Sequence, residues 1–384
     1  MNSRASRRDF LATGLALPAA AIATPQTAKA PPTERPASGA LAYRTLGKTG
    51  LKVTAVGFGC MITSDPAVIA RALDMGITYF DTARFYQHGN NERMVGSALK
   101  GSRNKIVLSS KSLAKTKTEA LQDLDTSLKE LSSDHLDIWH MHMRDAPADI
   151  PDECLDAWQA AKKAGKIRFI GVSSHNPNNI VDRVLSAGIF DVLLSTYNFT
   201  VGSNNDATYR RLKDTGLGLV AMKVMAPAAG GRGRGGAPAK PAGPPEQFLA
   251  SLKWVLQSDM MDTAIPSMVD TDQLEMNFRA MSEKFGAQDK KVLTALNEDI
   301  RPFYCRMCYR CTGQCPKGAA IPETIRYLSY ADFYGQFALG REHFAMLPEQ
   351  ARTIRCGDCE FCSVVCPNGV HVAERMVRAQ ELFG

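Results

Sequence analysis

The sequence predicts an α/β protein, a TIM (β/α)8 barrel followed by a small α-helical domain. Short apolar segments alternate with amphipathic helical patterns eight times between residues 53 and 283, as a parallel barrel of βα units requires. No Gly-x-Gly-x-x-Gly follows the first apolar segment, so an open, doubly wound sheet is the less favoured alternative. Beyond the last unit, cysteines gather between residues 305 and 366 and indicate a second, smaller domain.

The eight strand–helix units are predicted from residue type and period. The strands are short apolar runs, at residues 53–59, 77–81, 105–111, 136–142, 166–173, 190–198, 217–224 and 263–267. The helices repeat apolar residues three to four apart, at residues 65–76, 91–99, 117–131, 152–165, 177–187, 205–214, 245–257 and 271–283. Gly76 and Gly165 end two of them, as glycine often does.

The N-terminus predicts export. Arg7-Arg8 precede Phe10-Leu11, an Ala/Leu-rich run and an Ala28-Lys29-Ala30 exit, so residues 1–30 resemble a twin-arginine-type signal peptide. A membrane anchor is the alternative, but the apolar run is too short to span a bilayer and Pro18 interrupts it. We therefore expect the export machinery as a partner, a periplasmic location in a Gram-negative-type cell, and no transmembrane segment after signal removal.

The remaining chain divides by composition. Residues 31–40 predict a linker, residues 41–290 the barrel, and residues 291–384 the cysteine-rich domain. A Gly/Pro/Arg-rich stretch at residues 228–245 follows the seventh strand. It is either a solvated loop or a lid whose arginines reach a phosphate or an acidic partner, and the sequence leaves both open.

The charge balance excludes one class of partner. The chain has 46 basic and 39 acidic residues, a formal charge of +7, and no clustered basic helix. Nucleic-acid binding needs a strongly basic face. We expect no nucleic acid as a partner.

Two cysteine runs predict iron–sulfur clusters. CRMCYRCTGQCP starts at residue 305 and CGDCEFCSVVCP at residue 356, and both follow the C-x2-C-x2-C-x3-C-P pattern that holds [4Fe–4S] clusters. In two-cluster ferredoxins the fourth cysteine of each run binds the other cluster. The predicted ligands are Cys305, Cys308, Cys311 and Cys366 for one cluster, and Cys315, Cys356, Cys359 and Cys362 for the other. The small domain is therefore predicted to be ferredoxin-like.

Zinc and disulfides are the alternatives for these cysteines. Zinc sites usually take two C-x2-C pairs separated by a wide gap, whereas each run here places four cysteines within eleven residues. Cysteines two residues apart also make poor disulfide partners, because the geometry of the bridge is demanding. The pattern favours iron–sulfur clusters.

Four polar residues lie where a barrel displays its chemistry. Asp81, Tyr86, Lys111 and His142 sit at or just beyond the ends of the second, third and fourth predicted strands. A tyrosine can serve as general acid if a lysine ammonium stabilises its phenolate, while an aspartate holds the lysine and a histidine orients a carbonyl. Each residue alone also has an ordinary structural explanation, as a cap, a surface charge or a satisfied polar contact.

Together these residues resemble the catalytic tetrad of the aldo-keto reductase family. The text around them, FDTARFYQHGNNERMVGSAL, DIWHMHMRD, GVSSHNP and AIPSMVDTDQLEMNF, extends the resemblance over residues 43–283. The resemblance implies a TIM barrel that moves a hydride between a nicotinamide cofactor, NAD(P), and a small carbonyl or alcohol substrate. Tyr86 is then the proton donor, Lys111 and Asp81 tune it, and His142 positions the substrate. The implied cofactor contacts are Ser173, Ser174, Ser267, Gln273 and Asn277.

The predicted function is an exported oxidoreductase whose two clusters exchange electrons with a redox partner protein. Ser174 departs from the family pattern, and the choice between NAD and NADP stays open. Two alternatives remain: an iron–sulfur electron carrier whose barrel no longer binds nucleotide, and a reductase whose clusters are purely structural. The substrate and the oligomeric state are not predicted.

Overall fold

The computed structural model describes residues 41–225, 228 and 245–384. The predicted signal peptide, the linker and nearly all of the Gly/Pro/Arg-rich stretch lie outside these residues. In the described part of the chain, no helix is long and apolar enough to cross a membrane.

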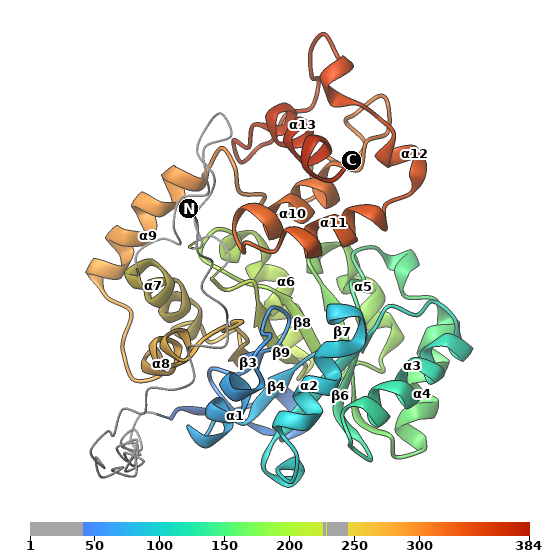
Figure 1. Ribbon diagram of the computed structural model, residues 1–384, viewed down its shortest axis with the longest axis vertical. Coiled ribbons are helices and arrows are strands. Elements are labelled where there is room, and N and C mark those ends of the chain that lie inside the picture. Colours follow the sequence, from blue (N-terminus) through green and yellow to red (C-terminus); the bar gives the residue numbers. More distant parts are fainter. Residues whose placement is uncertain (1–40, 226–227, 229–244) are drawn as a thin grey trace, which may run out of the picture. The chain divides into compact units, whose positions relative to one another are not determined.

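Eight parallel strands form the barrel, whose place in the molecule is seen in Figure 1. They are β3 (Phe58–Gly59), β4 (Tyr79–Asp81), β5 (Val107–Ser112), β6 (Leu136–Met141), β7 (Ile167–Ser174), β8 (Val192–Thr196), β9 (Gly218–Met222) and β10 (Thr263–Ala264), hydrogen-bonded in this order. Parallel bridges from Val56 to Ala264 and from Gly59 to Ser267 join the two edges. The sheet therefore closes on itself, and the predicted barrel architecture is confirmed.

A β-hairpin precedes the barrel, and the sequence pattern did not predict it. Strands β1 (Tyr43–Thr45) and β2 (Lys52–Thr54) pair antiparallel around a short turn. Gly47 in this turn has φ +47°, and a Cβ there would lie 2.3 Å from the backbone nitrogen of Gly218, so only glycine allows this approach. The predicted strand 53–59 is consequently divided, because its first residues belong to the hairpin and only its end belongs to the barrel.

Eight helices surround the strands. They are α1 (Pro66–Asp74), α2 (Asn90–Ala98), α3 (Lys117–Glu130), α4 (Asp152–Lys163), α5 (Pro177–Ala187), α6 (Gly202–Asp214), α7 (Pro245–Leu256) and α8 (Thr271–Arg279). Each bound lies within about four residues of the predicted one, because the apolar stripe that the sequence shows is the stripe that packs on the sheet. The rings of Trp139 on β6 and Trp158 on α4 stack with centroids 3.8 Å apart.

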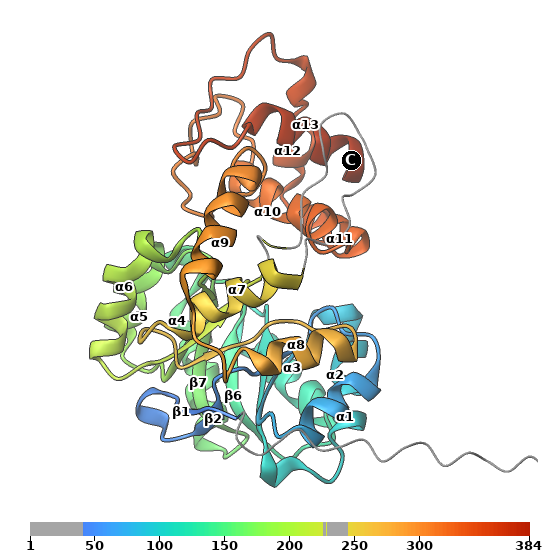
Figure 2. The same ribbon diagram turned by 90° about the vertical axis from the view of Figure 1, so that its left-hand side faces the viewer.

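The C-terminal segment, defined here as residues 287–384, is α-helical as predicted. It contains α9 (Ala287–Ile300), α10 (Ile321–Asp332), α11 (Phe337–Ala345), α12 (Glu349–Arg352) and α13 (Val372–Phe383). Leu293, Leu296 and Ile300 of α9 share an apolar cluster with Ala250 of α7, and Figure 2 shows these helices side by side. Helices α10, α11 and α13 form a second apolar cluster with one another. The cysteine runs lie in the loops before α10 and before α13.

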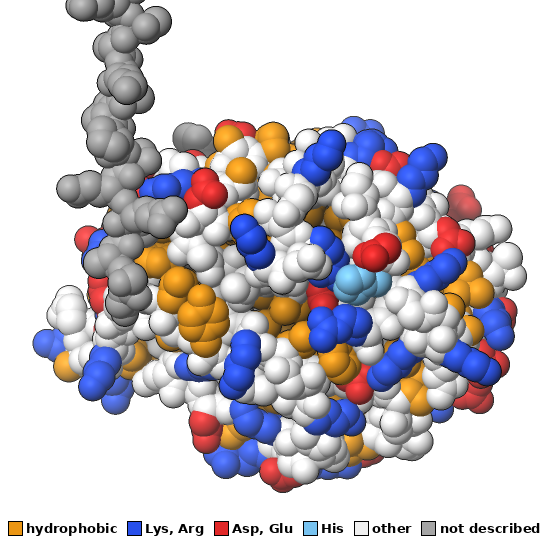
Figure 3. Space-filling model, turned by 90° about the horizontal axis from the view of Figure 1, so that it is seen from below, with side chains coloured by type: hydrophobic (Ala, Val, Ile, Leu, Met, Phe, Trp, Pro, Cys, Tyr) orange, Lys and Arg blue, Asp and Glu red, His pale blue; other side chains and the backbone are white. Residues whose placement is uncertain are grey.

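Charged side chains are mixed on the face shown in Figure 3, which is turned away from α10–α13. Lys and Arg lie interspersed with Asp and Glu across this face.

Candidate active site and cysteine-rich segment

The barrel brings the four predicted catalytic side chains together at the C-terminal ends of its strands. Asp81 is the last residue of β4, Lys111 lies in β5, and His142 directly follows β6. Tyr86 begins a 3-10 turn (Tyr86–Gly89) after β4. Parallel strands place their carboxyl ends at one rim, which is why residues 61 positions apart in the chain meet here.

Hydrogen bonds join three of the four residues. The Lys111 Nζ donates to Asp81 Oδ2 at 2.5 Å, to the carbonyl oxygen of Thr82 at 2.6 Å and to Tyr86 Oη at 3.3 Å. The three donors of the ammonium are thereby used. The imidazole of His142 meets the ring of Tyr86 edge-on, with centroids 5.6 Å apart. A carbonyl oxygen placed beside Tyr86 would therefore also lie beside His142.

Burial sets the protonation states of this group. It raises the pKa of Tyr86 to about 12, an effect that Lys111 opposes and Asp81 reinforces. Burial, the largest influence, would lower the pKa of Lys111, but Asp81 and Tyr86 together outweigh it and hold that pKa above its usual value. Burial, followed by the charge of Lys111, lowers the pKa of His142 well below 6.5. At neutral pH the site therefore holds a protonated phenol, a charged ammonium and a neutral imidazole.

The turn after Tyr86 is held in an uncommon backbone conformation. Gln87 and His88 have φ of 51° and 52°, a region that non-glycine residues seldom adopt. The Gln87 side chain donates to the carbonyl oxygen of Thr63 at 2.8 Å and fixes the turn. Such backbone positions collect at functional sites, where the surrounding structure maintains them.

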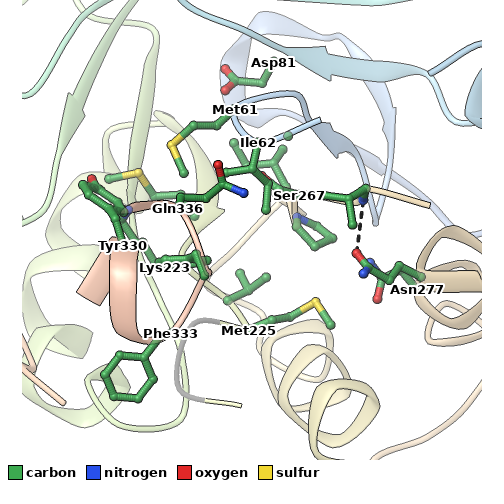
Figure 4. A pocket seen from close by; sticks show the side chains of 18 of the residues that line it. Met61, Ile62, Asp81, Lys223, Met225, Ser267, Asn277, Tyr330, Phe333 and Gln336 are labelled. Atoms are coloured by element: carbon green, nitrogen blue, oxygen red, sulfur yellow. Dashed lines mark hydrogen bonds between the residues drawn. The ribbon is translucent and has the colours of Figure 1, made fainter. Parts of the chain in front are cut away.

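A cavity of about 580 Å³ opens above the tetrad (Figure 4). Asp81, Tyr86, Lys111 and His142 all line it. Its volume falls within the roughly 300–1,000 Å³ range of small-molecule and cofactor sites. Most other lining residues are apolar, among them Met61, Ile62, Met222, Met225, Ile265 and Phe333. The tetrad thus forms a polar part of the lining of a largely apolar cavity.

Four of the five predicted cofactor contacts reach this cavity. Ser173, Ser267, Gln273 and Asn277 line it, and Ser174 does not. The Ser174 hydroxyl instead donates to Asp145 Oδ1 at 3.1 Å and accepts from the backbone of Asn176. Successive residues of a strand face opposite sides, so Ser173 and Ser174 cannot both face the cavity.

Asn277 shows the clearest unmet bonding capacity among these residues. It is 1% exposed, and neither its amide nitrogen nor its amide oxygen has a partner among the described residues. Buried polar groups in proteins are nearly always hydrogen-bonded. A side chain of this kind that lines a cavity points to a ligand that satisfies it.

The C-terminal segment supplies part of the cavity wall, which the sequence pattern did not predict. Tyr330, Phe333, Tyr334, Gln336 and His343 line the cavity from α10, α11 and the residues between them. Nothing in their local sequence marks them as functional, since an aromatic helix usually indicates core packing. Their role becomes visible only when the segment is seen against the barrel.

A buried ion pair connects this segment to the barrel. Asp145, which follows β6, accepts from Arg326 Nη1 at 2.6 Å and from Tyr309 Oη at 3.0 Å. The His175 backbone donates to the other oxygen of the same carboxylate at 2.6 Å. Burial would raise the pKa of Asp145, but His175 and Arg326 together hold it well below its usual value. Asp145 is therefore an ionised link between the barrel, α10 and the first cysteine run.

The eight cysteines of the two runs fall into two neighbourhoods. All ten cysteines of the chain are described, and none of them forms a disulfide. Burial raises the pKa of Cys305 to about 12, and nearby Cys311, Cys308 and Cys366 reinforce the shift. Burial likewise raises the pKa of Cys356, with Cys315, Cys359 and Cys362 among its neighbours. The described residues contain no group of three or more His, Cys, Asp or Glu that could hold a metal ion as they stand.

The chain shows similarity to known proteins mainly in the barrel. Residues 63–250 match the sequence model of the aldo/keto reductase family. An L-galactose dehydrogenase from Arabidopsis thaliana is 32% identical over 211 residues, which cover 48% of this chain and 65% of that protein. The aldo-keto reductase YhdN from Bacillus subtilis is 30% identical over 155 residues, covering 34% and 46%. The chain thus spans about half the length of the curated relatives it matches.

Solved structures show the same fold. The holo form of aldo-keto reductase AKR11C1 from Bacillus halodurans superposes with a TM-score of 0.57 at 24% identity, covering 67% of this chain and 96% of that one. An aldo-keto reductase from Klebsiella pneumoniae in complex with NADPH gives 0.56 at 23% identity, covering 67% and 95%. The barrel is therefore an aldo/keto reductase-type fold.

Proposed function

We propose that this protein, which contains an aldo/keto reductase-type oxidoreductase domain over residues 63–250, interconverts a small carbonyl compound and its alcohol with a nicotinamide nucleotide. The observation that carries the proposal is the buried Asp81–Lys111–Tyr86 chain beside a neutral His142 on the floor of the cavity. A bound nucleotide would supply or accept the hydride. The protein's own residues then have to manage one proton and the orientation of the substrate.

The tetrad can donate that proton to the substrate. Tyr86, protonated at neutral pH because its pKa is raised to about 12, donates its hydroxyl proton to the carbonyl oxygen. The phenolate that forms is stabilised by the Lys111 ammonium, which Asp81 holds at 2.5 Å. His142 is neutral and donates a hydrogen bond that orients the carbonyl oxygen. Each element acts where negative charge develops, in a site from which bulk water is largely excluded.

The cavity residues fit a nicotinamide nucleotide. Asn277 presents an unsatisfied amide on α8, and Ser267 and Gln273 line the same wall. The Asp270 side chain caps α8 and also accepts from the side chain of Gln273 at 3.1 Å, so this wall is pre-formed. The Klebsiella pneumoniae structure of the same fold holds NADPH, which supports the proposed cofactor class.

Replacing Asn277 by Leu tests this cofactor site. We expect the dissociation constant for NADPH, or for NADH if that is the preferred nucleotide, to rise about 5- to 30-fold, since one or two hydrogen bonds are lost. Titration calorimetry of the purified protein measures it. The exposed Asn90→Leu variant on α2 is the matched control and should bind like wild type. An unchanged affinity in Asn277→Leu would remove Asn277 from the site.

We further propose that the C-terminal segment holds two [4Fe–4S] clusters. The two cysteine neighbourhoods match the two ligand sets expected from the motif, with Cys366 grouped with the first run and Cys315 with the second. Cys305, Cys311, Cys315, Cys356 and Cys366 pack against the apolar side chains of α10 and α13, a shell that limits solvent access to a cluster. Both runs follow the C-x2-C-x2-C-x3-C-P pattern of [4Fe–4S] ligands, which favours clusters over zinc.

The iron and sulfide content of anaerobically purified protein tests the clusters. We expect about eight irons and a similar amount of inorganic sulfide per chain. Cys366→Ser should alter the same reduced-state EPR signal as Cys305→Ser, and Cys356→Ser should alter the other. Cys154→Ser, at a buried cysteine outside the runs, is the control and should keep all the iron. Bound zinc without sulfide would contradict the proposal.

Export by the twin-arginine route to the periplasm is part of the proposal, because the Arg7-Arg8 motif precedes a short apolar run. That route carries folded proteins, as a protein assembled around clusters would require. The clusters would exchange electrons with a redox partner protein.

A further inference from the structure

The cavity contains a second lysine–tyrosine pair in addition to Lys111–Tyr86. Lys223 lies directly after β9, and its Nζ donates to Tyr330 Oη of α10 at 3.2 Å. The same nitrogen lies 4.3 Å from the ring centre of Tyr330 and 5.4 Å from that of Tyr334. Figure 4 shows Lys223 and Tyr330 together on one side of the cavity. This pair joins the barrel to the C-terminal segment.

The two pairs differ in one respect. Lys111 touches a phenol and a carboxylate, at 3.3 and 2.5 Å. Lys223 touches a phenol, but no carboxylate of the described residues lies within ion-pair distance of it. An ammonium has three donors, and a tyrosine hydroxyl that accepts from it can still donate its own proton. Both groups can therefore donate to an anion that enters the cavity.

A negatively charged ligand would also stabilise the ammonium form of Lys223 in its buried surroundings. Because a charge placed among apolar walls lacks solvation, burial, and then the Arg326 guanidinium, lowers the pKa of Lys223 to about 7, although the Asp145 carboxylate, beyond ion-pair distance, partly opposes this shift. His343 is 2% exposed and lines the cavity, with its ring centre 5.1 Å from that of Tyr330. Neither nitrogen of the His343 ring has a hydrogen-bond partner among the described residues. An unpartnered buried imidazole beside an ammonium without a carboxylate indicates a ligand that satisfies both.

The backbone of Lys223 supports a functional role. Its φ is +59°, a left-handed conformation that costs a non-glycine residue about 1–2 kcal/mol. Its carbonyl oxygen accepts from Asn198 Nδ2 at 3.1 Å, which helps to hold this conformation. Glycine would adopt this conformation without strain, so a lysine at this position lowers the stability of the fold.

We propose that Lys223, Tyr330 and His343 form a subsite for an anionic oxygen group, and that this group is an acid function of the substrate. This inference rests on the proposed function, because the anionic group is assigned to the carbonyl substrate of that reaction. A nucleotide phosphate has the same chemistry, but Asn277 and Ser267 lie across the cavity from Lys223 in Figure 4. The preferred substrates are therefore carbonyl compounds that carry a carboxylate, and the C-terminal segment contributes to their selection.

Two aldehydes that differ only in charge test this subsite: 4-formylbenzoate and its methyl ester. For Lys223→Met we expect the dissociation constant of 4-formylbenzoate, measured by calorimetry, to rise about 10- to 100-fold, since a hydrogen-bonded charge pair is lost. Affinity for the methyl ester and for NADPH should change less than about twofold. Lys223→Arg should recover most of the loss, and Tyr330→Phe, which keeps the ring, should show a smaller one.

Unchanged discrimination between acid and ester in Lys223→Met would overturn the proposal. A loss of NADPH affinity with unchanged discrimination would also overturn it, by placing the anion on the nucleotide. Because calorimetry needs no turnover, Lys223-dependent binding of 4-formylbenzoate without any NADPH oxidation would uphold the subsite and refute the proposed reaction. If wild type and Lys223→Met reduce both aldehydes equally well, the proposed reaction is upheld and the subsite is refuted.

Discussion

Replacing Tyr86 by Phe is expected to lower kcat for carbonyl reduction by about 10²- to 10⁴-fold, the usual contribution of a positioned general acid. The ring still fills its place against His142 and Lys111, so nucleotide affinity should be retained. Steady-state kinetics of NADPH oxidation measure the change. Tyr209→Phe, at a buried tyrosine that donates to Thr196 outside the cavity, is the matched control and should keep wild-type kcat.

The pH profile provides a second readout for Tyr86. Reduction uses the protonated phenol, which persists across the physiological range because its pKa is raised to about 12. Alcohol oxidation uses the phenolate, whose fraction grows tenfold with each pH unit below that pKa. We expect oxidation to accelerate from pH 6 to pH 10 while reduction stays nearly level. A Tyr86→Phe enzyme within about threefold of wild type would exclude Tyr86 as the proton donor.

Replacing Arg326 by Met is expected to destabilise the protein by about 3–5 kcal/mol, because it leaves the ionised Asp145 buried without the guanidinium that pairs with it. The two side chains are 3% and 13% exposed. The Arg211→Met variant removes an ion pair to Asp182 in which the two side chains are 54% and 85% exposed, and should cost less than about 1 kcal/mol. Urea unfolding of both variants measures the difference.

The same variant tests whether the C-terminal segment completes the cavity. Arg326 lies on α10, the helix that carries Tyr330, so its loss should also weaken binding of 4-formylbenzoate.

The ion pair also makes stability depend on pH. The pKa of Asp145 is held low, so the contribution of this carboxylate to stability is complete above the unfolded pKa of about 4 and disappears as the pH falls through the folded value. Equal unfolding midpoints for Arg326→Met and wild type would show that the ion pair does not hold the segment.

The sequence predicted the barrel because its eight units rely on local pattern. The apolar period of each helix and strand is visible in the order of the residues, and strand ends in a barrel share one rim. For that reason the order of the residues was sufficient to place Asp81, Tyr86, Lys111 and His142 together. The hairpin was not predicted, because its strands are three residues long and are too short to show the alternation of apolar and polar residues.

Contacts between distant segments could not be predicted from local sequence. Ser174 was assigned to the cofactor by resemblance, although its neighbour Ser173 already faces the cavity and a strand alternates its sides. Lys223 falls within the predicted seventh strand at residues 217–224, and its partner Tyr330 lies 107 positions later in the chain. The link through Asp145, Arg326 and Tyr309 also joins residues that no local pattern relates.

The central claim is that the barrel moves a hydride between a nicotinamide nucleotide and a carbonyl carbon under proton control by Tyr86. A single anaerobic turnover of methyl 4-formylbenzoate with NADPH or NADH deuterated at C4 tests it most directly. We expect mass spectrometry to find deuterium on the carbinol carbon of the product, in proportion to the nucleotide oxidised and strongly reduced in Tyr86→Phe. Binding of neither nucleotide, or an alcohol product without deuterium, would contradict hydride transfer in this barrel.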